Sequence, residues 1–197
     1  LGITPSCVHS AAKYPEFHAG FVAGLRNLSH FCNQMTPLHH RDIGLVGAGL
    51  LLDEIRLELI CDKLHVSPEM IALTFKVKGA ERIMLISDAM RASGMPDGEY
   101  TLGGLPVIVR DGAARLKEGG ALAGSTLRLN HALRNVAEVT QKPLSEVVAA
   151  SSLTAAESVG LAGIGRLEPG YFADIVLLDT DFEVVHTFVG GELRYSR

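Results

Sequence analysis

The chain has 197 residues, of which 47% are hydrophobic and 20% charged, and its formal net charge is −4. This length provides one substantial hydrophobic core, or one large and one small domain, and falls short of the roughly 250 residues of a complete (β/α)8 barrel. The weakly acidic composition argues against nucleic acid and against an anionic membrane surface as partners. The longest apolar run, residues 43–52, has about half of the roughly 20 residues that a membrane span needs. We therefore expect a soluble, cytoplasmic protein.

The first 88 residues alternate apolar, strand-like segments with segments of helical periodicity. Strands are predicted at residues 6–9, 27–31, 56–61 and 82–88, and helices at residues 14–24, 43–53 and from residue 68 onward. Ser67 is a typical N-cap, and Pro68 stands at the first helical position, where proline is favoured. The fourth strand is apolar on both faces and ends on Asp88, as expected of a central strand covered by helices. Four successive strand and helix units predict a parallel sheet with right-handed crossovers.

The second half of the chain has a different pattern. Residues 100–116 contain two short β-prone runs around Asp111-Gly112, a hairpin signal. A glycine-rich loop leads through a predicted helix cap at Ser125-Thr126 into an amphipathic helix. The remaining predicted elements are helices at residues 127–139, 144–150 and 154–159, and strands within residues 165–179, 182–189 and 192–195. The last strands leave the alternation of strand and helix, so we assign them to a small β domain.

Four ionisable residues stand at or just after the ends of the four predicted parallel strands: His9, His30, His65 and Asp88. A single residue of this kind is more often a packed side chain or the cap of a turn. The carboxyl ends of parallel strands meet at one edge of the sheet, where α/β proteins place their chemistry. Four such residues together therefore favour an active site.

Two imidazoles from adjacent strands can hold one divalent metal ion, with Zn²⁺ as the first choice and Fe, Mn, Co or Ni as alternatives. His9 and His30 are the candidate ligands, and the sequence offers no obvious third ligand. Asp88 would act as the general base toward a water at the metal, and then as the general acid toward the leaving group.

The loop at residues 33–42 is rich in polar and basic groups and includes Arg41. A planar guanidinium matches two phosphate oxygens, so the loop can bind an anion, although basic loops are also common as solvated surface. The three cysteines, Cys7, Cys32 and Cys61, fit no zinc spacing, and we expect buried, reduced thiols.

Six motifs carry a resemblance to a known family. They are Val8-His9-Ser10-Ala11-Ala12, the segment 29–35 around His30, His39-His40-Arg41-Asp42, Asp62-Lys63-Leu64-His65, Ile86-Ser87-Asp88-Ala89-Met90 and Leu122-Ala123-Gly124-Ser125-Thr126. Their order and approximate spacing resemble those of N-acetylglucosamine-6-phosphate deacetylases of the amidohydrolase superfamily. The whole chain is similar to the C-terminal half or so of a family member.

The resemblance implies an α/β fold in two parts. Residues 1–163 would form the C-terminal half of a TIM-like (β/α)8 metal-dependent hydrolase barrel: its last four βα units, the C-terminal helices and a β-hairpin insertion near residues 99–117. Residues 164–197 would form part of a small β-sandwich domain. The N-terminal part of the family fold, which supplies a Glu metal ligand, would be absent.

The resemblance also implies roles for individual residues. His9 and His30 would be metal ligands, and Asp88 the catalytic residue that activates water and protonates the leaving amine. The substrate-binding residues would be Asn33, Gln34, Arg41, His65, Leu122, Ala123 and Gly124. The partner would be a small phosphorylated amino sugar, and the protein would be a homodimer in which some phosphate contacts cross the subunit interface.

Three residues depart from the family pattern: Val8, Gln34 and Lys63 stand where Gly, Ala and Gly are usual. A larger side chain there is expected to narrow the pocket or to require another backbone angle, which bears on substrate fit more than on metal chemistry. The expected reaction is hydrolysis of N-acetylglucosamine 6-phosphate to glucosamine 6-phosphate and acetate. The alternatives are an amidohydrolase of another N-acyl or cyclic amide substrate, and an inactive fragment or scaffold that lacks the third metal ligand.

Overall fold

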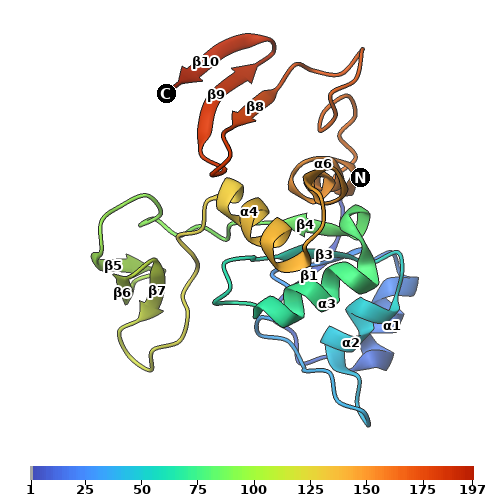
Figure 1. Ribbon diagram of the computed structural model, residues 1–197. Coiled ribbons are helices and arrows are strands. Elements are labelled where there is room, and N and C mark those ends of the chain that lie inside the picture. The colour runs from blue at the N-terminus through green and yellow to red at the C-terminus, as the bar shows by residue number, and fades with distance from the viewer. Residues whose placement is uncertain (1) are drawn as a thin grey trace.

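The computed structural model describes residues 2–197, and its centre is a parallel sheet of four short strands. The strands are β1 (Ser6–Cys7), β2 (Asn27–Leu28), β3 (Arg56–Leu59) and β4 (Ile83–Leu85), which pair in this order along the sheet (Figure 1). All three pairs are parallel, with Asn27 opposite Arg56 and Leu57 opposite Ile83. The predicted parallel sheet is confirmed, and each strand is shorter than predicted.

The predicted strand at residues 82–88 is wrong at both ends. Ala80–Arg82 form a 3-10 helix, and β4 stops at Leu85. The amide of Ile86 still donates to the carbonyl of Leu59 at 3.1 Å, after which the chain leaves the sheet. Asp88 has a φ of 49°, in the left-handed region that strand residues do not adopt. Asp88 therefore stands on a loop, three residues beyond the strand.

Helices α1 (Tyr14–Val22), α2 (Gly44–Leu51) and α3 (Pro68–Lys78) follow the first three strands and pack along the sheet (Figure 1). Ser67 caps α3 as predicted, and its Oγ accepts a hydrogen bond from the amide of Met70 at 3.3 Å. Helix α2 is apolar and nearly all buried, and Gly49 brings it close to the sheet. A Cβ at Gly49 would lie 2.7 Å from Leu28 Cδ1 and 2.9 Å from Phe31 Cε2.

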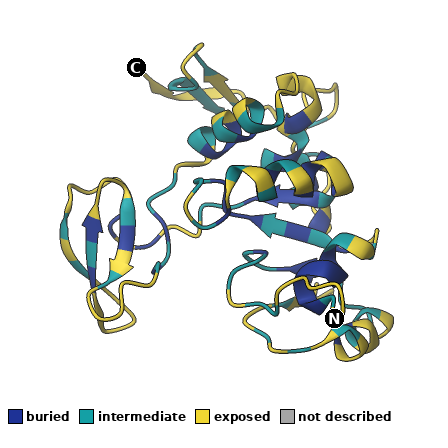
Figure 2. Ribbon diagram, turned by 60° about the horizontal axis from the view of Figure 1, so that its bottom comes forward, coloured by how far each residue is buried: buried dark blue, intermediate teal, exposed yellow. Residues whose placement is uncertain are grey.

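The main hydrophobic core fills the space between the parallel sheet and these helices. Figure 2 shows that burial is concentrated in the strands and on the inner helix faces. The fully buried side chains of this core include Leu28, Phe31, Leu45, Ile55, Leu57, Leu59, Ile71 and Ile83. Removing each of them from water contributes up to about 1.5–3 kcal/mol, so this cluster holds the edge of the sheet where the predicted site residues stand.

Helices α4 (Leu129–Thr140), α5 (Leu144–Val147) and α6 (Leu153–Ser158) complete the main body, with a 3-10 turn at Val148–Ser151. The predicted cap of α4 at Ser125-Thr126 is wrong, because the N-cap is Arg128 and it makes no side-chain cap bond. The hydroxyls of Ser125 and Thr126 instead form hydrogen bonds to carbonyls of other loops. Ser125 donates to the carbonyl of Ser87, and Thr126 donates to that of Gly112 at 2.7 Å.

A second, antiparallel sheet is set apart from the main body in Figure 2. It consists of β5 (Gly98–Leu102), β6 (Leu105–Arg110) and β7 (Ala113–Leu116), in that order. The predicted hairpin at Asp111-Gly112 is confirmed, since both residues have positive φ, 49° and 74°, as a type I′ turn requires. A second turn at Gly103-Gly104, which joins β5 to β6, was not predicted.

The chain ends in a third sheet of strands β8 (Ile175–Leu178), β9 (Val184–Val189) and β10 (Glu192–Ser196), paired antiparallel in the order β10-β9-β8 (Figure 1). Helix α4 is tied to the turn before β9: Asn130 Nδ2 donates to the carbonyl of Phe182 at 2.8 Å, and His131 Nε2 lies 2.9 Å from Glu183 Oε1. Phe182 has a φ of 63° and belongs to that turn, so the predicted strand at 182–189 begins too early.

The cysteine side chains and the lengths of the helices bear on two further expectations. All three cysteines are free thiols; Cys61 is fully buried, whereas Cys7 and Cys32 are only partly buried. Burial raises the pKa of the Cys32 thiol to about 12, so this thiol is protonated at neutral pH. Within residues 2–197, the helices are too short or too polar to cross a membrane.

Candidate active site

A cavity of about 730 Å³ opens where the four parallel strands end. Its lining includes a residue that follows each strand: His9 after β1, His30 after β2, Ile60 after β3 and Asp88 after β4. Apart from Arg41, all of the predicted site residues line this cavity, namely His9, His30, Asn33, Gln34, His65, Asp88, Leu122, Ala123 and Gly124. The structure thus brings together residues as distant in the chain as His9 and Gly124, which are 115 positions apart.

The imidazoles of His9 and His30 stack, with ring centroids 4.5 Å apart and planes inclined by 29°. Nδ1 of His30 is buried and has no hydrogen-bond partner. A buried polar atom without a partner costs about 1–3 kcal/mol, and a metal ion bound by this nitrogen would relieve that cost. The pair therefore fits two ligands of a divalent metal site. Within residues 2–197, however, the His, Cys, Asp and Glu side chains form no cluster of three or more suited to a metal, so the pair alone is not a complete site.

Three of the residues at the strand ends share an unusual backbone. His9, His30 and Asp88 have φ values of 44°, 34° and 49°, in the left-handed region that glycine adopts freely, Asn and Asp tolerate, and most other residues avoid. Strained conformations of this kind cost about 1–3 kcal/mol each and cluster at functional sites. The repetition of this backbone conformation after three of the four parallel strands supports a functional role for this edge of the sheet.

The loop that carries Asp88 is fastened to the loop at residues 122–125. The amide of Ser125 donates to the carbonyl of Asp88 at 2.8 Å, and the amide of Met90 donates to the carbonyl of Ser125 at 2.9 Å. Gly124 has a φ of 61°, and a Cβ on it would lie 3.0 Å from Met90 Cβ and 3.3 Å from the Asp88 carbonyl oxygen. Glycine thus allows the two loops to approach closely, and this contact sets the position of Asp88.

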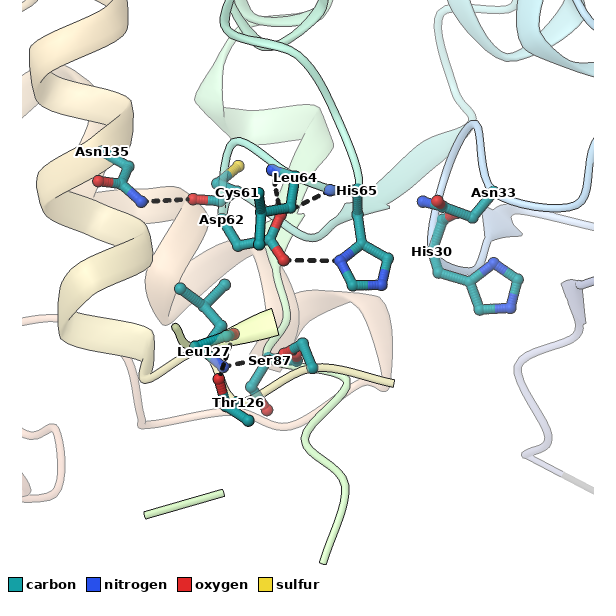
Figure 3. Close-up of polar contacts among 12 residues, drawn as sticks. His30, Asn33, Cys61, Asp62, Leu64, His65, Ser87, Thr126, Leu127 and Asn135 are labelled. Atoms are coloured by element: carbon teal, nitrogen blue, oxygen red, sulfur yellow. Dashed lines mark hydrogen bonds and ion pairs between the residues drawn. The ribbon is translucent and has the colours of Figure 1, made fainter. Parts of the chain in front are cut away.

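His65 is held by its neighbour in the sequence, Asp62. Nδ1 of His65 lies 2.6 Å from Asp62 Oδ2, and the backbone amides of Leu64 and His65 both donate to Asp62 Oδ1 at 2.8 Å (Figure 3). Burial acts to raise the pKa of Asp62, but the hydrogen bonds from the His65 ring and from the two amides outweigh burial and hold this pKa below its ordinary value. Asp62 is therefore ionised at neutral pH.

One wall of the cavity was not predicted. The three-stranded sheet contributes Leu102, Leu105 and Leu116, which line the same cavity as His9 and His30. Leu102 and Leu105 flank the Gly103-Gly104 turn. A pair of leucines around a tight glycine turn is a sequence signal that could have indicated an apolar hairpin tip.

Arg41 lies outside the cavity lining, on an exposed turn. Its Nη1 is 2.6 Å from His40 Nε2, and its amide donates to His39 Nδ1 at 3.3 Å. The turn is fixed by Lys13, whose ammonium is 3.2 Å from Asp42 Oδ2. The hydrogen bond from Lys13 and that from the amide of Gly44 hold the pKa of Asp42 below its ordinary value. The chain itself therefore leaves the Arg41 guanidinium at the surface, away from His9 and His30.

At two of the three positions that depart from the family pattern, the residue has a positive φ, a backbone angle that favours glycine. Gln34 and Lys63 have φ values of 53° and 66°. Gln34 lines the cavity. The ammonium of Lys63 instead bonds to Glu138 Oε2 on α4 at 2.7 Å. The departure at Lys63 is therefore a matter of backbone angle, and the departure at Gln34 adds a polar side chain to the site.

The chain has an α/β fold with a cavity at the ends of its parallel strands, and its sequence is that of an amidohydrolase. The model of the Amidohydrolase family matches residues 51–194, and the chain belongs to this family. A curated N-acetylglucosamine-6-phosphate deacetylase of Lysinibacillus sphaericus is 42% identical over 193 residues, which are 98% of this chain and 50% of that protein. An N-acetylgalactosamine-6-phosphate deacetylase of Escherichia coli O157:H7 is 45% identical over 186 residues, 94% of this chain and 49% of that protein.

The same likeness appears among solved structures. The crystal structure of N-acetylglucosamine-6-phosphate deacetylase from Thermotoga maritima superposes with a TM-score of 0.95 at 45% identity, covering 100% of this chain and 54% of that chain. The α/β fold of this chain is therefore the fold found in the corresponding part of a deacetylase. The chain spans about half the length of the relatives that it matches here.

Proposed function

We propose that this protein hydrolyses the acetamide of N-acetylglucosamine 6-phosphate to give glucosamine 6-phosphate and acetate. The observation that supports this most is the single cavity that gathers His9, His30, His65 and Asp88 at the ends of four parallel strands. The names of the similar deacetylases point to the same class of substrate, an N-acetylated amino sugar that carries a 6-phosphate. The proposal places the protein in amino sugar catabolism in the cytoplasm.

The proposal extends to the architecture of the protein. Residues 1–163 would be the C-terminal half of a TIM-like barrel with the β5 to β7 sheet inserted, and residues 164–197 would be part of a small β-sandwich. The open arrangement of four parallel strands and the likeness to a chain of about twice the length support this division. A homodimer is part of the proposal. Arg41 at the surface, outside the cavity of its own chain, fits phosphate contacts that cross a subunit interface.

His9 and His30 would hold the divalent metal ion, Zn²⁺ by preference, through their imidazole nitrogens. A metal ion bound there would lower the pKa of a water and polarise the acyl oxygen of the substrate. The two rings lie side by side, with centroids 4.5 Å apart, so both histidines are available at one place in the cavity. A further ligand is needed, since the His, Cys, Asp and Glu side chains of residues 2–197 form no cluster of three or more suited to a metal.

Asp88 would transfer the proton. Its carboxylate accepts a proton from water while the water oxygen forms a bond to the acyl carbon. As the bond between carbon and nitrogen breaks, the carboxylic acid returns that proton to the nitrogen, which leaves as the amine. The loop contact with Ser125 and Gly124 holds the backbone of Asp88 in place during both transfers.

The remaining lining would bind the sugar. Asn33 and Gln34 supply polar groups on the side of His9 and His30, and Leu122, Ala123 and Gly124 line the side of Asp88. The leucines of the β5 to β7 sheet form an apolar surface, which suits the methyl of an acetyl group and the apolar face of a sugar ring.

N-acetylgalactosamine 6-phosphate is the second candidate substrate. The observation that favours it is the 45% identity to a relative named for that substrate. The two sugars differ in the configuration of one hydroxyl. Gln34 lines the cavity and stands where a small residue is usual, and we propose that its side chain discriminates between the two sugars.

Acetate release from the zinc-loaded chain tests the proposed function. We expect release from the two phosphorylated sugars and much less from N-acetylglucosamine itself. Arg41→Ala is expected to raise the KM for phosphorylated substrates about 10-fold to 100-fold, because a charged hydrogen bond is worth about 1.5–3 kcal/mol. The KM for the plain sugar should not change.

The matched control is Arg128→Ala, which removes another exposed guanidinium away from the cavity lining. If Arg41→Ala weakens both kinds of substrate equally, the phosphate assignment is wrong. If the metal-loaded chain releases no acetate from any N-acyl or cyclic amide substrate, the reading as an inactive scaffold is correct.

Gly124→Ala is expected to reduce turnover about 10-fold to 100-fold, because a Cβ would push against Met90 and the Asp88 carbonyl and shift the proton-transferring carboxylate. The left-handed φ adds about 1–2 kcal/mol of lost stability. Gly119→Ala is the control, since Gly119 has a similar φ of 77° but open space around it. Gly119→Ala should lose only the stability that the left-handed φ costs, Gly124→Ala should lose more in urea unfolding, and only Gly124→Ala should lose turnover.

A further inference from the structure

The loop that carries His65 is anchored to helix α4 at two points. Asn135 Nδ2 donates to the carbonyl of Cys61 at 2.8 Å, and Lys63 Nζ lies 2.7 Å from Glu138 Oε2. Figure 3 shows Asn135 reaching from the helix to the first residue of the loop. These contacts hold the loop as a whole, but neither of them touches the imidazole of His65.

The orientation of the imidazole is set within the loop by Asp62. One carboxylate oxygen, Oδ1, accepts both backbone amides and closes the turn, while the other, Oδ2, is left for the ring at 2.6 Å. The pair is well shielded from water, with side-chain exposures of 7% for His65 and 11% for Asp62. A hydrogen bond shielded in this way is stronger than one in water.

The chemistry of the pair decides which ring nitrogen carries the proton. An ionised carboxylate has no hydrogen to donate, so the hydrogen bond at Oδ2 requires an N–H on Nδ1 of His65. In the neutral ring, Nε2 then bears the lone pair. Within residues 2–197, Nε2 makes no hydrogen bond, and His65 lines the cavity that also holds His30 and Asp88.

We propose that Asp62 is a positioning residue: it holds His65 as the Nδ1–H tautomer and thereby leaves Nε2 as an acceptor for a hydroxyl or amide N–H of the substrate. The assignment of the tautomer stands on the geometry of this chain alone. Only the role toward a substrate rests on the proposed deacetylase function. No part of the proposal requires a metal ion.

Asp62→Asn separates the positioning role from a structural one. The amide oxygen of Asn can still accept the two backbone amides, so the turn is retained. Its NH2 group would then face Nδ1 of His65, and Nδ1 must become the acceptor. The proton moves to Nε2, which now presents a donor to the cavity. The same exchange of Asp for Asn beside a catalytic histidine reverses the tautomer in serine proteases.

The chain offers a matched control in Asp179. Its Oδ1 accepts the backbone amides of Asp181 and Glu183, both at 2.9 Å, and its Oδ2 lies 2.7 Å from Arg197 Nη2. Asp179 therefore has the same set of bonds as Asp62, two amides and one side chain, but it does not line the cavity. Asp179→Asn should cost stability in the tail sheet without changing His65.

Nuclear magnetic resonance of the 197-residue chain with ¹⁵N-labelled histidine tests the tautomer directly, because two-bond couplings between nitrogen and ring hydrogens distinguish Nδ1–H from Nε2–H. The His65 signals are identified by their loss in His65→Gln. We expect Nδ1–H in the parent chain and in Asp179→Asn, and Nε2–H in Asp62→Asn. An Nε2–H tautomer in the parent chain overturns the proposal, and that measurement needs no folded variant.

Turnover tests the second half of the proposal. Asp62→Asn is expected to lower kcat/KM for N-acetylglucosamine 6-phosphate about 10-fold to 100-fold, whereas Asp179→Asn should stay within about 2-fold of the parent. Full activity in an Asp62→Asn chain with the reversed tautomer would show that Nε2 does not serve the substrate. If the parent chain itself has no turnover, the proposed function fails, and the resonance experiment still decides the role of Asp62 toward His65.

Discussion

Replacing Asp88 with Asn is expected to slow acetate release by about 10²-fold to 10⁴-fold, the usual contribution of a general acid and base. The amide has nearly the same shape as the carboxylate, and Asn tolerates the left-handed φ of 49° at this position. The fold and the bonds to Ser125 should therefore persist. The amide cannot take the proton of water, so both proton transfers are lost. Acetate release at saturating substrate, with metal content measured on the same sample, checks this result.

Asp111→Asn is a close control for this change. Asp111 has the same φ of 49° and is exposed, but it lies in the turn between β6 and β7. Its replacement should leave turnover unchanged. Acetate release by Asp88→Asn at the rate of the parent chain would sink the assignment of Asp88, and loss of bound metal together with turnover would make Asp88 a ligand instead.

Phe31→Ala is expected to destabilise the chain by about 3–5 kcal/mol, the usual cost of removing a buried aromatic ring from a core. Phe31 is fully buried, directly follows His30 and packs against helix α2, where Gly49 leaves room for its ring. Its amide also donates to the carbonyl of Glu58 at 2.7 Å, which ties the segment after β2 to β3. The change should lower the midpoint of urea unfolding measured by circular dichroism.

The control is Phe172→Ala, because the side chain of Phe172 is 65% exposed. Its replacement should change the free energy of unfolding by about 0.5 kcal/mol or less, as is usual for surface positions. Equal losses for the two variants would mean that Phe31 does not belong to the cooperative core, and the account of the sheet edge would need revision.

The parallel sheet could be predicted because its signal is local. Each βα unit shows a change from an apolar run to helical periodicity, and the cap at Ser67-Pro68 marks a helix start. The ends of the strands could not be predicted in the same way. Asp88 comes only two residues after the apolar run that ends at Ile86, and it is bonded outside the sheet to Ser125, far along the chain. Ser125 was misread as a helix cap for the same reason.

The residues around the cavity were predicted from their places at the strand ends, and the structure puts His9, His30, His65 and Asp88 around one cavity. Their roles stay predictions. What the sequence pattern did not reveal was how these side chains are oriented. The hydrogen bond between His65 and Asp62 requires a turn that only the fold defines. The apolar wall of the cavity comes from a hairpin whose orientation is set by tertiary contacts.

At His9, His30 and Asp88 the left-handed backbone favours glycine, whereas the proposed reaction uses the side chain, so stability and activity favour different residues there. Glycine would adopt these angles with less strain than histidine, so the fold on its own would gain from losing its imidazoles. Laboratory evolution that rewards heat tolerance alone would therefore drift toward glycine at the two histidine positions and discard the residues that the proposed reaction needs. A selection for stable variants of this chain would have to test for the proposed turnover in every round.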